Sequence, residues 1–317
     1  MQINLDRDAL SRVIAVMNGK GGVLKTTLTA NIAGLLAANG QHVLAVDLDP
    51  QGNLAEDLGY RGDDRDDEGQ RLATALFSGD PIEPVRDIRP NLDVLVGGRK
   101  LDGAAAVLAR SGPASVDAQL ALARVLAPIA SDYDVILLDC PPGEEALQTA
   151  AAGAARWMLV PVKSDAASRR GFDAVAERME LVRGQIQGKQ GINPGIDLLG
   201  VILVDTTTSA TVVQREARQL IEGVGEEATG DVFKATVRHS EATAQSARER
   251  GVLVHELDKI AAEQPKWYDV LKGEAAQVGF APRTATSVAD DLQAVTEELI
   301  ARLVEREAAT QPAGQPA

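Results

Sequence analysis

The sequence predicts an α/β protein in which a doubly wound, mostly parallel sheet carries helices on both faces and is followed by a C-terminal helical extension. Short apolar runs alternate with segments of helical periodicity, which is the pattern of strand–helix–strand units. Several runs are apolar throughout, as expected for strands that are covered on both faces. A glycine-rich loop joins the first apolar run to the first helical segment.

Eight apolar segments are predicted to be strands, and helical periodicity lies between them. The predicted strands are Val13–Met17, Val43–Val46, Leu92–Val96, Val135–Leu138, Trp157–Val162, Leu198–Val204, Val232–Val237 and Val252–His255. The predicted helices are Leu28–Ala38, Ala104–Arg110, Val116–Leu126, Gly171–Val182, Val212–Ile221 and Glu241–Arg250. In such a sheet, ligands are expected at the carboxyl ends of the strands.

We expect one main domain over residues 1–258, a partly helical extension over 259–307 and a disordered tail over 308–317. Helical periodicity runs from Val288 to Glu307 within the extension. The tail consists of Ala, Thr, Gln, Pro and Gly, a composition that cannot bury a core.

The composition is that of a soluble cytoplasmic protein. The chain has 317 residues, of which 45% are hydrophobic and 25% are charged. Its formal net charge of -14 does not favour nucleic acid, so DNA contact would need a local basic patch. A single cysteine, Cys140, excludes an intramolecular disulfide. No leader opens the chain, and no apolar run approaches the roughly 18 residues of a membrane span.

Residues Gly19 to Thr27 read GKGGVLKTT and have the features of a phosphate-binding loop. Converging backbone N–H groups at a helix N-terminus bind phosphates, and glycines allow the tight bend that this needs. Lys25 would reach the β- and γ-phosphates, Thr26 would ligate Mg²⁺, and Thr27 could donate to an α-phosphate oxygen. We therefore expect ATP or ADP with Mg²⁺ as cofactors, bound by Gly19, Lys20, Gly21, Gly22, Val23, Leu24, Lys25, Thr26 and Thr27.

Leu24 stands where the pattern G-x-x-x-x-G-K-[ST] has its second glycine. A branched side chain at this position requires either backbone strain or additional room. Three glycines remain, so nucleotide binding could persist, but full affinity does not follow from the motif.

Carboxylates follow two other predicted strands. Asp47 and Asp49 come after Val43–Val46, and Asp139 comes after Val135–Leu138. In a parallel sheet these groups would lie beside the phosphate loop, where Mg²⁺ and the attacking water need them. A single strand-end aspartate could equally cap a helix or a turn. Three of them beside a phosphate loop make that alternative much weaker.

These motifs resemble those of the ParA/MinD family of deviant Walker A ATPases, which have the P-loop NTPase type of fold. The resemblance rests on Lys20-Gly21-Gly22-x-x-Lys25-Thr26-Thr27, on DLDPQGN at Asp47–Asn53 and on YDVILLDCPPG at Tyr133–Gly143. DPQGN and DCPP look like the ParA branch, the DNA-partition motors, more than the MinD branch. Looser similarity continues at Trp157–Phe172 and Val232–Leu257, so that the resemblance covers residues 12–258.

The resemblance implies a role for each matching residue. Lys20 would be a signature lysine that reaches the partner's ATP in a sandwich dimer. Lys20, Lys25 and Asp49 would be the catalytic residues, with Asp49 positioning the attacking water. The metal site would consist of Thr26, Asp47 near the metal, and Asp139, which orders the water shell.

Arg238 is a candidate for non-specific DNA contact, because its T-V-R stretch matches a loop of the family, although a solvated surface position explains it equally well. Weaker candidates are Lys234, Arg215, Arg218, Arg169 and Arg170. The C-terminal end lacks a basic amphipathic helix, so no membrane partner is expected. The phosphate loop begins near residue 18, so no helix-turn-helix domain is expected before it. One cysteine argues against the nitrogenase iron-protein branch.

The resemblance implies a slow, Mg²⁺-dependent ATPase whose ATP-bound homodimer binds non-specific DNA of the nucleoid. Hydrolysis stimulated by a ParB-like centromere-binding protein would release it, and the cycle would segregate a plasmid or a chromosome. The acidic charge leaves open an alternative, a nucleotide-gated adaptor that positions a protein cargo. A third possibility is that Leu24 impairs ATP affinity or turnover.

Overall fold

The computed structural model describes residues 5–112, 115–163, 166–184, 191–207, 215, 232–263 and 281–310. Within these residues, an eight-stranded sheet has the order β3-β4-β2-β5-β1-β6-β7-β8. Its neighbouring strands are parallel except for the antiparallel pair β3–β4. The strands are β1 (Val13–Val16), β2 (Val43–Asp47), β3 (Val85–Arg89), β4 (Leu92–Leu95), β5 (Val135–Asp139), β6 (Trp157–Val162), β7 (Asp197–Thr206) and β8 (Val237–Arg238).

Each face of the sheet has its own hydrophobic core, because successive residues of a strand point to opposite sides. In β1, Val13 and Ala15 belong to one cluster of buried residues, whereas Ile14 and Val16 belong to the other. All four side chains are fully buried. This two-sided burial explains why the central strands are apolar throughout instead of alternating.

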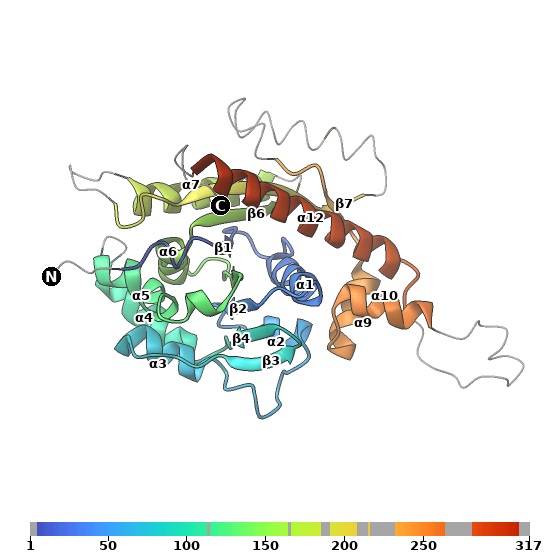
Figure 1. Cartoon of the computed structure of the whole chain (residues 1–317), viewed down its shortest axis with the longest axis horizontal. Coiled ribbons are helices and arrows are strands. Elements are labelled where there is room, and N and C mark those ends of the chain that lie inside the picture. Colours follow the sequence, from blue (N-terminus) through green and yellow to red (C-terminus); the bar gives the residue numbers. More distant parts are fainter. Residues whose placement is uncertain are drawn as a thin grey trace, which may run out of the picture.

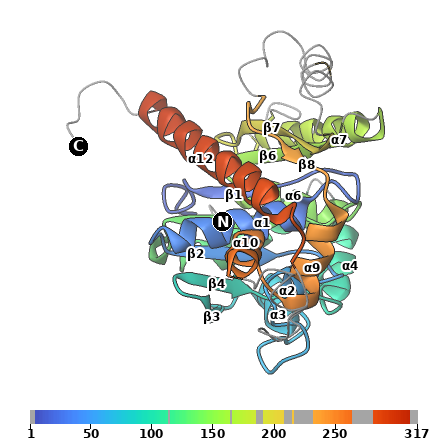
Figure 2. The same ribbon diagram turned by 90° about the vertical axis from the view of Figure 1, so that its right-hand side faces the viewer.

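Helices cover both faces of the sheet (Figure 1, Figure 2). Residues of α3, α4, α5, α6 and α7 contribute to one core, and residues of α1, α2, α10 and α12 to the other. None of the helices in the described part of the chain is both long and apolar enough to cross a membrane. The helices are α1 (Lys25–Ala38), α2 (Leu54–Asp57), α3 (Gln70–Ser78), α4 (Leu101–Ser111), α5 (Val116–Leu126), the 3-10 helix η1 (Ala130–Asp132), α6 (Glu145–Ala154), α7 (Ala166–Arg183), α9 (Glu241–Arg250), α10 (Val254–Ala262) and α12 (Ala285–Thr310).

The C-terminal helix α12 crosses the sheet edge at β8 and shares a core with α1 (Figure 2). Glu298 of α12 accepts hydrogen bonds from the backbone N–H groups of Lys234 and Ala235, at 3.0 and 2.9 Å. These groups lie between the isolated bridge at Val232 and β8, so the carboxylate pairs backbone N–H groups that lie outside the regular ladder. The predicted domain boundary at residue 258 falls inside α10.

The predicted fold class is confirmed, and several predicted elements have the observed bounds. Trp157–Val162, Val116–Leu126 and Glu241–Arg250 form β6, α5 and α9 as predicted. The sequence prediction missed α3, α6 and the short antiparallel strand β3. The predicted helix Val212–Ile221 and most of the predicted tail lie outside the described residues.

Two strand predictions differ from the structure. Val252–His255 is wrong as a strand, because α10 begins at Val254. Val254 and Leu257 are buried three residues apart, which is helical spacing, and the Glu256 carboxylate accepts the N–H of Leu253 at 2.8 Å as the helix starts. Val232–Val237 is partly wrong, since Val232 forms an isolated bridge and regular pairing begins at Val237.

Substituting Gly153 with alanine should destabilise the contact between α5 and α6. An ideal Cβ at Gly153 would lie 1.8 Å from the carbonyl oxygen of Gln119, so the helices would have to separate. We expect the free energy of unfolding to fall by about 1–3 kcal/mol in urea denaturation.

Gly103→Ala in α4 is the matched control, because no atom outside the helix lies within 4 Å of its ideal Cβ. This change should raise the free energy of unfolding by about 0.5–1 kcal/mol, since glycine is unfavourable inside a helix. Equal effects of the two substitutions would contradict the role of Gly153.

Candidate functional site

The phosphate loop connects β1 to α1, and Asn18 fixes its first residues. The Asn18 side chain is fully buried and donates from Nδ2 to the carbonyl oxygen of Pro161 in β6, at 2.8 Å. Its Oδ1 accepts the backbone N–H of Lys20, also at 2.8 Å. An ideal Cβ at Gly171 of α7 would lie 1.9 Å from Asn18 Oδ1, so this approach requires glycine. Sequence reasoning missed Asn18, which belongs to none of the motifs.

Leu24 is the residue that precedes α1, and it has the left-handed conformation with φ 58° and ψ 24°. This is the conformation that glycine adopts readily, and it costs an L-residue about 1–2 kcal/mol. The carbonyl of Leu24 still accepts the first helical hydrogen bond from Leu28, at 2.8 Å. Of the two consequences predicted for Leu24, the structure shows backbone strain.

Lys25 is buried at the start of α1 and folds back onto the loop. Its Nζ donates to the carbonyl oxygen of Lys20 at 2.8 Å. Burial lowers the pKa of Lys25, although the negative charges of Asp139 and Asp49 oppose this change. The loop therefore holds the Lys25 cation against its own backbone, at the place where a phosphate would be bound.

The strand register brings Asp47 and Asp139 together. Asp47 ends β2, Asp139 ends β5, and the two residues are direct partners in the parallel ladder. Both oxygens of Asp47 accept backbone N–H groups, from Asp49 at 2.9 Å and from Leu54 at 3.3 Å. An ideal Cβ at Gly97 would lie 2.5 Å from the Asp47 carboxyl carbon. Asp47 thus organises the loop that carries Asp49.

Asp139 is buried and has a different environment. Within the described residues, neither of its carboxylate oxygens has a hydrogen-bond partner. Burial raises the pKa of Asp139 to about 7, and the charges of Asp49 and Asp57 add to the rise. The Thr26 hydroxyl and the Lys25 cation act in the opposite direction and lower this pKa, so Thr26 lies beside Asp139.

An unpaired buried carboxylate beside a threonine hydroxyl is a set of hard oxygen donors, which suits Mg²⁺. Thr26 and Asp139 are therefore the residues that could hold a hydrated magnesium ion next to the loop. Within the described residues, no group of three or more His, Cys, Asp and Glu side chains is arranged to bind a metal by itself.

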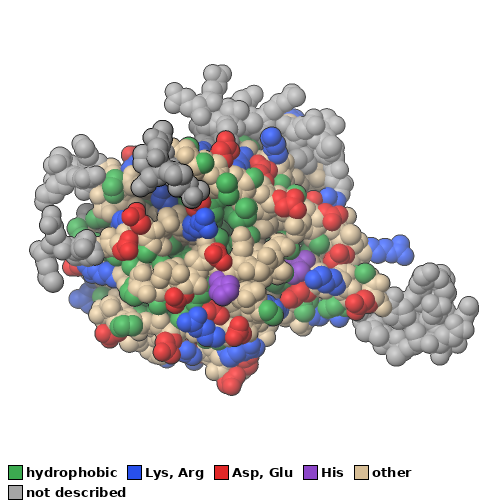
Figure 3. All heavy atoms as spheres, in the orientation of Figure 1, with side chains coloured by type: hydrophobic (Ala, Val, Ile, Leu, Met, Phe, Trp, Pro, Cys, Tyr) green, Lys and Arg blue, Asp and Glu red, His purple; other side chains and the backbone are tan. Residues whose placement is uncertain are grey.

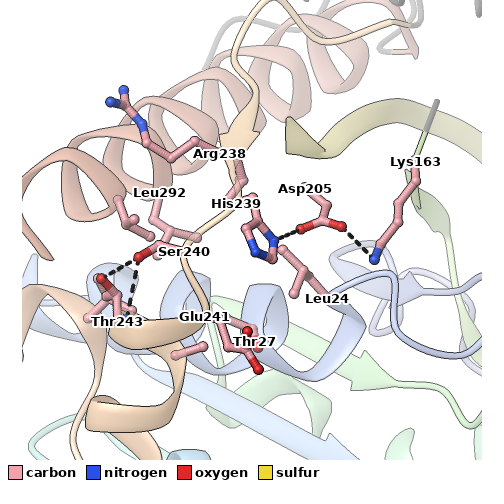
Figure 4. A pocket seen from close by; sticks show the side chains of 14 residues that line it. Leu24, Thr27, Lys163, Asp205, Arg238, His239, Ser240, Glu241, Thr243 and Leu292 are labelled. Atoms are coloured by element: carbon pink, nitrogen blue, oxygen red, sulfur yellow. Dashed lines mark hydrogen bonds and ion pairs between the residues drawn. The ribbon is translucent and has the colours of Figure 1, made fainter. Parts of the chain in front are cut away.

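A cavity of about 320 Å³ adjoins the loop on the side of Leu24 and Thr27 (Figure 4). Its apolar walls are Leu24, Val237, Ala244, Val254, Val288 and Leu292. At its polar end, Asp205 pairs with Lys163 at 2.6 Å and with His239. Asp205 itself has a left-handed backbone with φ 59°. Sequence reasoning missed this cavity, because residues from six separate segments form it.

The residues predicted to contact DNA have different surroundings in the described structure. Arg238 is held by Asp291 of α12, with its Nε at 2.6 Å from Oδ2 and its Nη2 at 2.7 Å from Oδ1. Lys234 is exposed, and so is Arg215. Arg218 and the side chains of Arg169 and Arg170 lie outside the described residues. On the face shown in Figure 3, acidic and basic side chains of the described residues are interspersed.

Comparison with known proteins identifies chromosome-partitioning proteins as relatives. Residues 11–192 match the family model of an AAA domain. The chain is 34% identical over 231 residues to the chromosome-partitioning ATPase Soj of Thermus thermophilus, a match that covers 73% of this chain and 84% of Soj. It is 31% identical over 255 residues to the chromosome partitioning protein ParA of Caulobacter vibrioides, covering 80% of this chain and 90% of that protein.

One similar solved structure contains a bound nucleotide analogue and magnesium. Cobyrinic acid a,c-diamide synthase from Mycobacterium smegmatis, with a bound ATP analogue and magnesium, shares 29% sequence identity at a TM-score of 0.59. The match covers 81% of this chain and 99% of that one. With the loop, the two strand-end carboxylates and these relatives taken together, the chain belongs to the ParA branch of the ParA/MinD family of P-loop ATPases.

Proposed function

We propose that this protein is a DNA-partition ATPase that acts as an ATP-gated sandwich dimer. The ATP-bound dimer binds DNA without sequence specificity, and a ParB-like partner stimulates hydrolysis and release. The observation that carries the proposal is Asp139, a buried carboxylate without a hydrogen-bond partner among the described residues, in register with Asp47 and beside Thr26. Soj and ParA, the relatives named above, are chromosome-partitioning proteins, which supports the same function.

The loop residues would change partners when ATP binds. The Lys25 cation would exchange the carbonyl of Lys20 for the phosphates, which are the stronger acceptors. Bound Mg²⁺ would neutralise charge on the phosphates, held by Thr26 directly and by Asp139 through water. Asp49 would position the attacking water, because Asp47 fixes its backbone at 2.9 Å.

The cavity beside Leu24 and Thr27 is where the nucleoside would bind. Its volume of about 320 Å³ and its apolar walls suit a small flat ring with few polar groups. Thr27 lies at the junction between this cavity and the phosphate loop. A nucleotide would thus extend from the loop N–H groups past Thr27 into the cavity.

The alternative function is a nucleotide-gated adaptor that positions a protein cargo. It is favoured by the ion pair of Arg238 with Asp291, which neutralises the leading candidate for DNA contact, and by the net charge of -14. A stable protein cargo in a pull-down, combined with no DNA binding, would support the adaptor over the partition ATPase.

Lys20→Ala is expected to bind ATP yet remain monomeric, because Lys20 would contact the nucleotide of the partner subunit. Asp49→Ala is expected to accumulate as an ATP-bound dimer, because the attacking water is no longer positioned. Light scattering after size exclusion, with and without ATP and Mg²⁺, measures both outcomes. Lys100→Ala, at an exposed lysine, is the control and should dimerise like the native chain. Normal dimerisation of Lys20→Ala would disprove the proposed role of Lys20.

Asp291→Asn is expected to strengthen DNA binding by the ATP-bound protein, because it releases the Arg238 cation from its ion pair. Retention on random-sequence DNA should rise, and the slope of log affinity against log salt should steepen by about one unit for one added phosphate contact. Asp102→Asn removes the same charge from the exposed start of α4 and should change neither quantity.

Two results would contradict this view of DNA binding. If the native protein is not retained on DNA at low salt with ATP and Mg²⁺, the partition function fails. If the native protein is retained and Asp291→Asn is not retained more strongly, the ion pair with Asp291 does not limit Arg238.

In the metal-free protein, the free energy of unfolding is expected to fall as the pH rises, because of the raised pKa of Asp139. Asp139→Asn should remove this part of the pH dependence. Between the ordinary value of 3.8 and the raised pKa of about 7, the unfolded chain releases the Asp139 proton while the folded chain retains it. The free energy of unfolding should therefore fall across this range. Thermal unfolding in EDTA should show that Asp139→Asn stabilises the protein more at pH 8 than at pH 4. The exposed Asp80→Asn should show no such difference.

A further inference from the structure

The backbone at Leu24 keeps the shape that a glycine would give it. Its φ of 58° lies in the left-handed region, and α1 starts from its carbonyl as it would from glycine. The backbone conformation at position 24 is therefore one that glycine also adopts readily. The difference between leucine and glycine at position 24 is therefore the side chain and the space that it occupies.

The Leu24 side chain is half-buried and packs against the core that contains α1 and α12. In Figure 4 it lies between Thr27 and the pair formed by His239 and Asp205, and it lines the cavity described above. Its neighbours across that cavity are apolar residues of β8, α10 and α12, namely Val237, Val254, Val288 and Leu292. A glycine at position 24 would leave this wall without a side chain.

The charges around the cavity show which part of a nucleotide would meet Leu24. Asp205 and Glu241 line the cavity, and its basic lining residues are already paired, Lys163 and His239 with Asp205 and Arg238 with Asp291. The carboxylates therefore disfavour the negatively charged phosphates there. The donors that phosphates require, the loop N–H groups of residues 19–23 and Lys25, are not among the residues that line the cavity. The uncharged sugar and base are thus the groups that fit against the Leu24 side chain.

We infer that Leu24 is a determinant of nucleoside binding, in which its side chain packs against the sugar and base and leaves the phosphate site unchanged. The inference rests on the proposed nucleotide function. The backbone strain at Leu24 is retained because it directs an apolar side chain into the nucleoside cavity. On this inference Leu24 increases the affinity for the nucleoside. The opposite possibility is that the leucine side chain obstructs the site and reduces the affinity for ATP.

The test compares two ligands that share phosphates and differ in the nucleoside. Isothermal titration in the presence of Mg²⁺ would measure the affinity of ATP and of inorganic tripolyphosphate for the native chain and its variants. In Leu24→Gly, the affinity for ATP should fall by about tenfold, the order expected for one lost apolar contact, while tripolyphosphate binds as before.

Leu24→Asn is the second variant, because asparagine has nearly the size of leucine and tolerates the left-handed conformation. It should also weaken ATP selectively, since only the apolar character of the side chain is lost. Val304→Ala, at a side chain that is 57% exposed on α12, is the control and should bind both ligands like the native chain.

The other possible results overturn the inference, and they show whether the proposed ATPase function fails with it. Unchanged or tighter ATP binding by Leu24→Gly would show that Leu24 is indifferent or obstructs the site, while the ATPase function stands. Equal changes for ATP and tripolyphosphate would assign Leu24 to the phosphate site. If neither the native chain nor Leu24→Gly binds ATP, the inference and the proposed function both fail.

Discussion

The arrangement of the site depends on two buried carboxylates that end neighbouring strands in direct register. Asp47 and Asp139 are ladder partners in a region from which water is excluded, where two like charges oppose each other. Asp47 is stabilised by two backbone N–H groups of the loop that follows it. Asp139 has no such partner among the described residues. The strand order β2-β5-β1 therefore places the unsatisfied acid beside the phosphate loop, where a cation can compensate it.

The sequence predicts this part of the site because the geometry of a parallel sheet is general. Strands of equal direction end at one edge, so Asp47 and Asp139 are expected at the same edge as the loop after β1, and the strand order β2-β5-β1 makes them neighbours. Asn18 could not be predicted in the same way. It donates to Pro161 and lies against Gly171, both far away in the chain, and only the positions of β6 and α7 bring these residues together. The ion pair between Arg238 and Asp291 likewise depends on where α12 crosses β8.

Leu24 shows how a local departure from a motif can have a consequence outside that motif. The sequence predicts strain or a need for room, since both follow from a branched side chain in a glycine position. The structure shows the strained backbone, and the side chain lies in a cavity formed by β7, β8, α9, α10 and α12 as well as by the loop. No local pattern contains that cavity, so the role that we infer for Leu24 toward a nucleoside could not be predicted from the sequence.

Strand β8 carries Arg238 and helix α12 carries its partner Asp291, and both elements also line the cavity beside Leu24. His239 points into the cavity from the residue after Arg238, and Val288 and Leu292 line it from the helix that carries Asp291 (Figure 4). A ligand in the cavity therefore contacts β8 and α12 at the place where Arg238 and Asp291 join them. If ligand binding changes the spacing between β8 and α12, the ion pair between Arg238 and Asp291 changes with it. Arg238 itself lines the cavity, so coupling between a bound nucleotide and this proposed DNA-contact residue needs no long path through the fold.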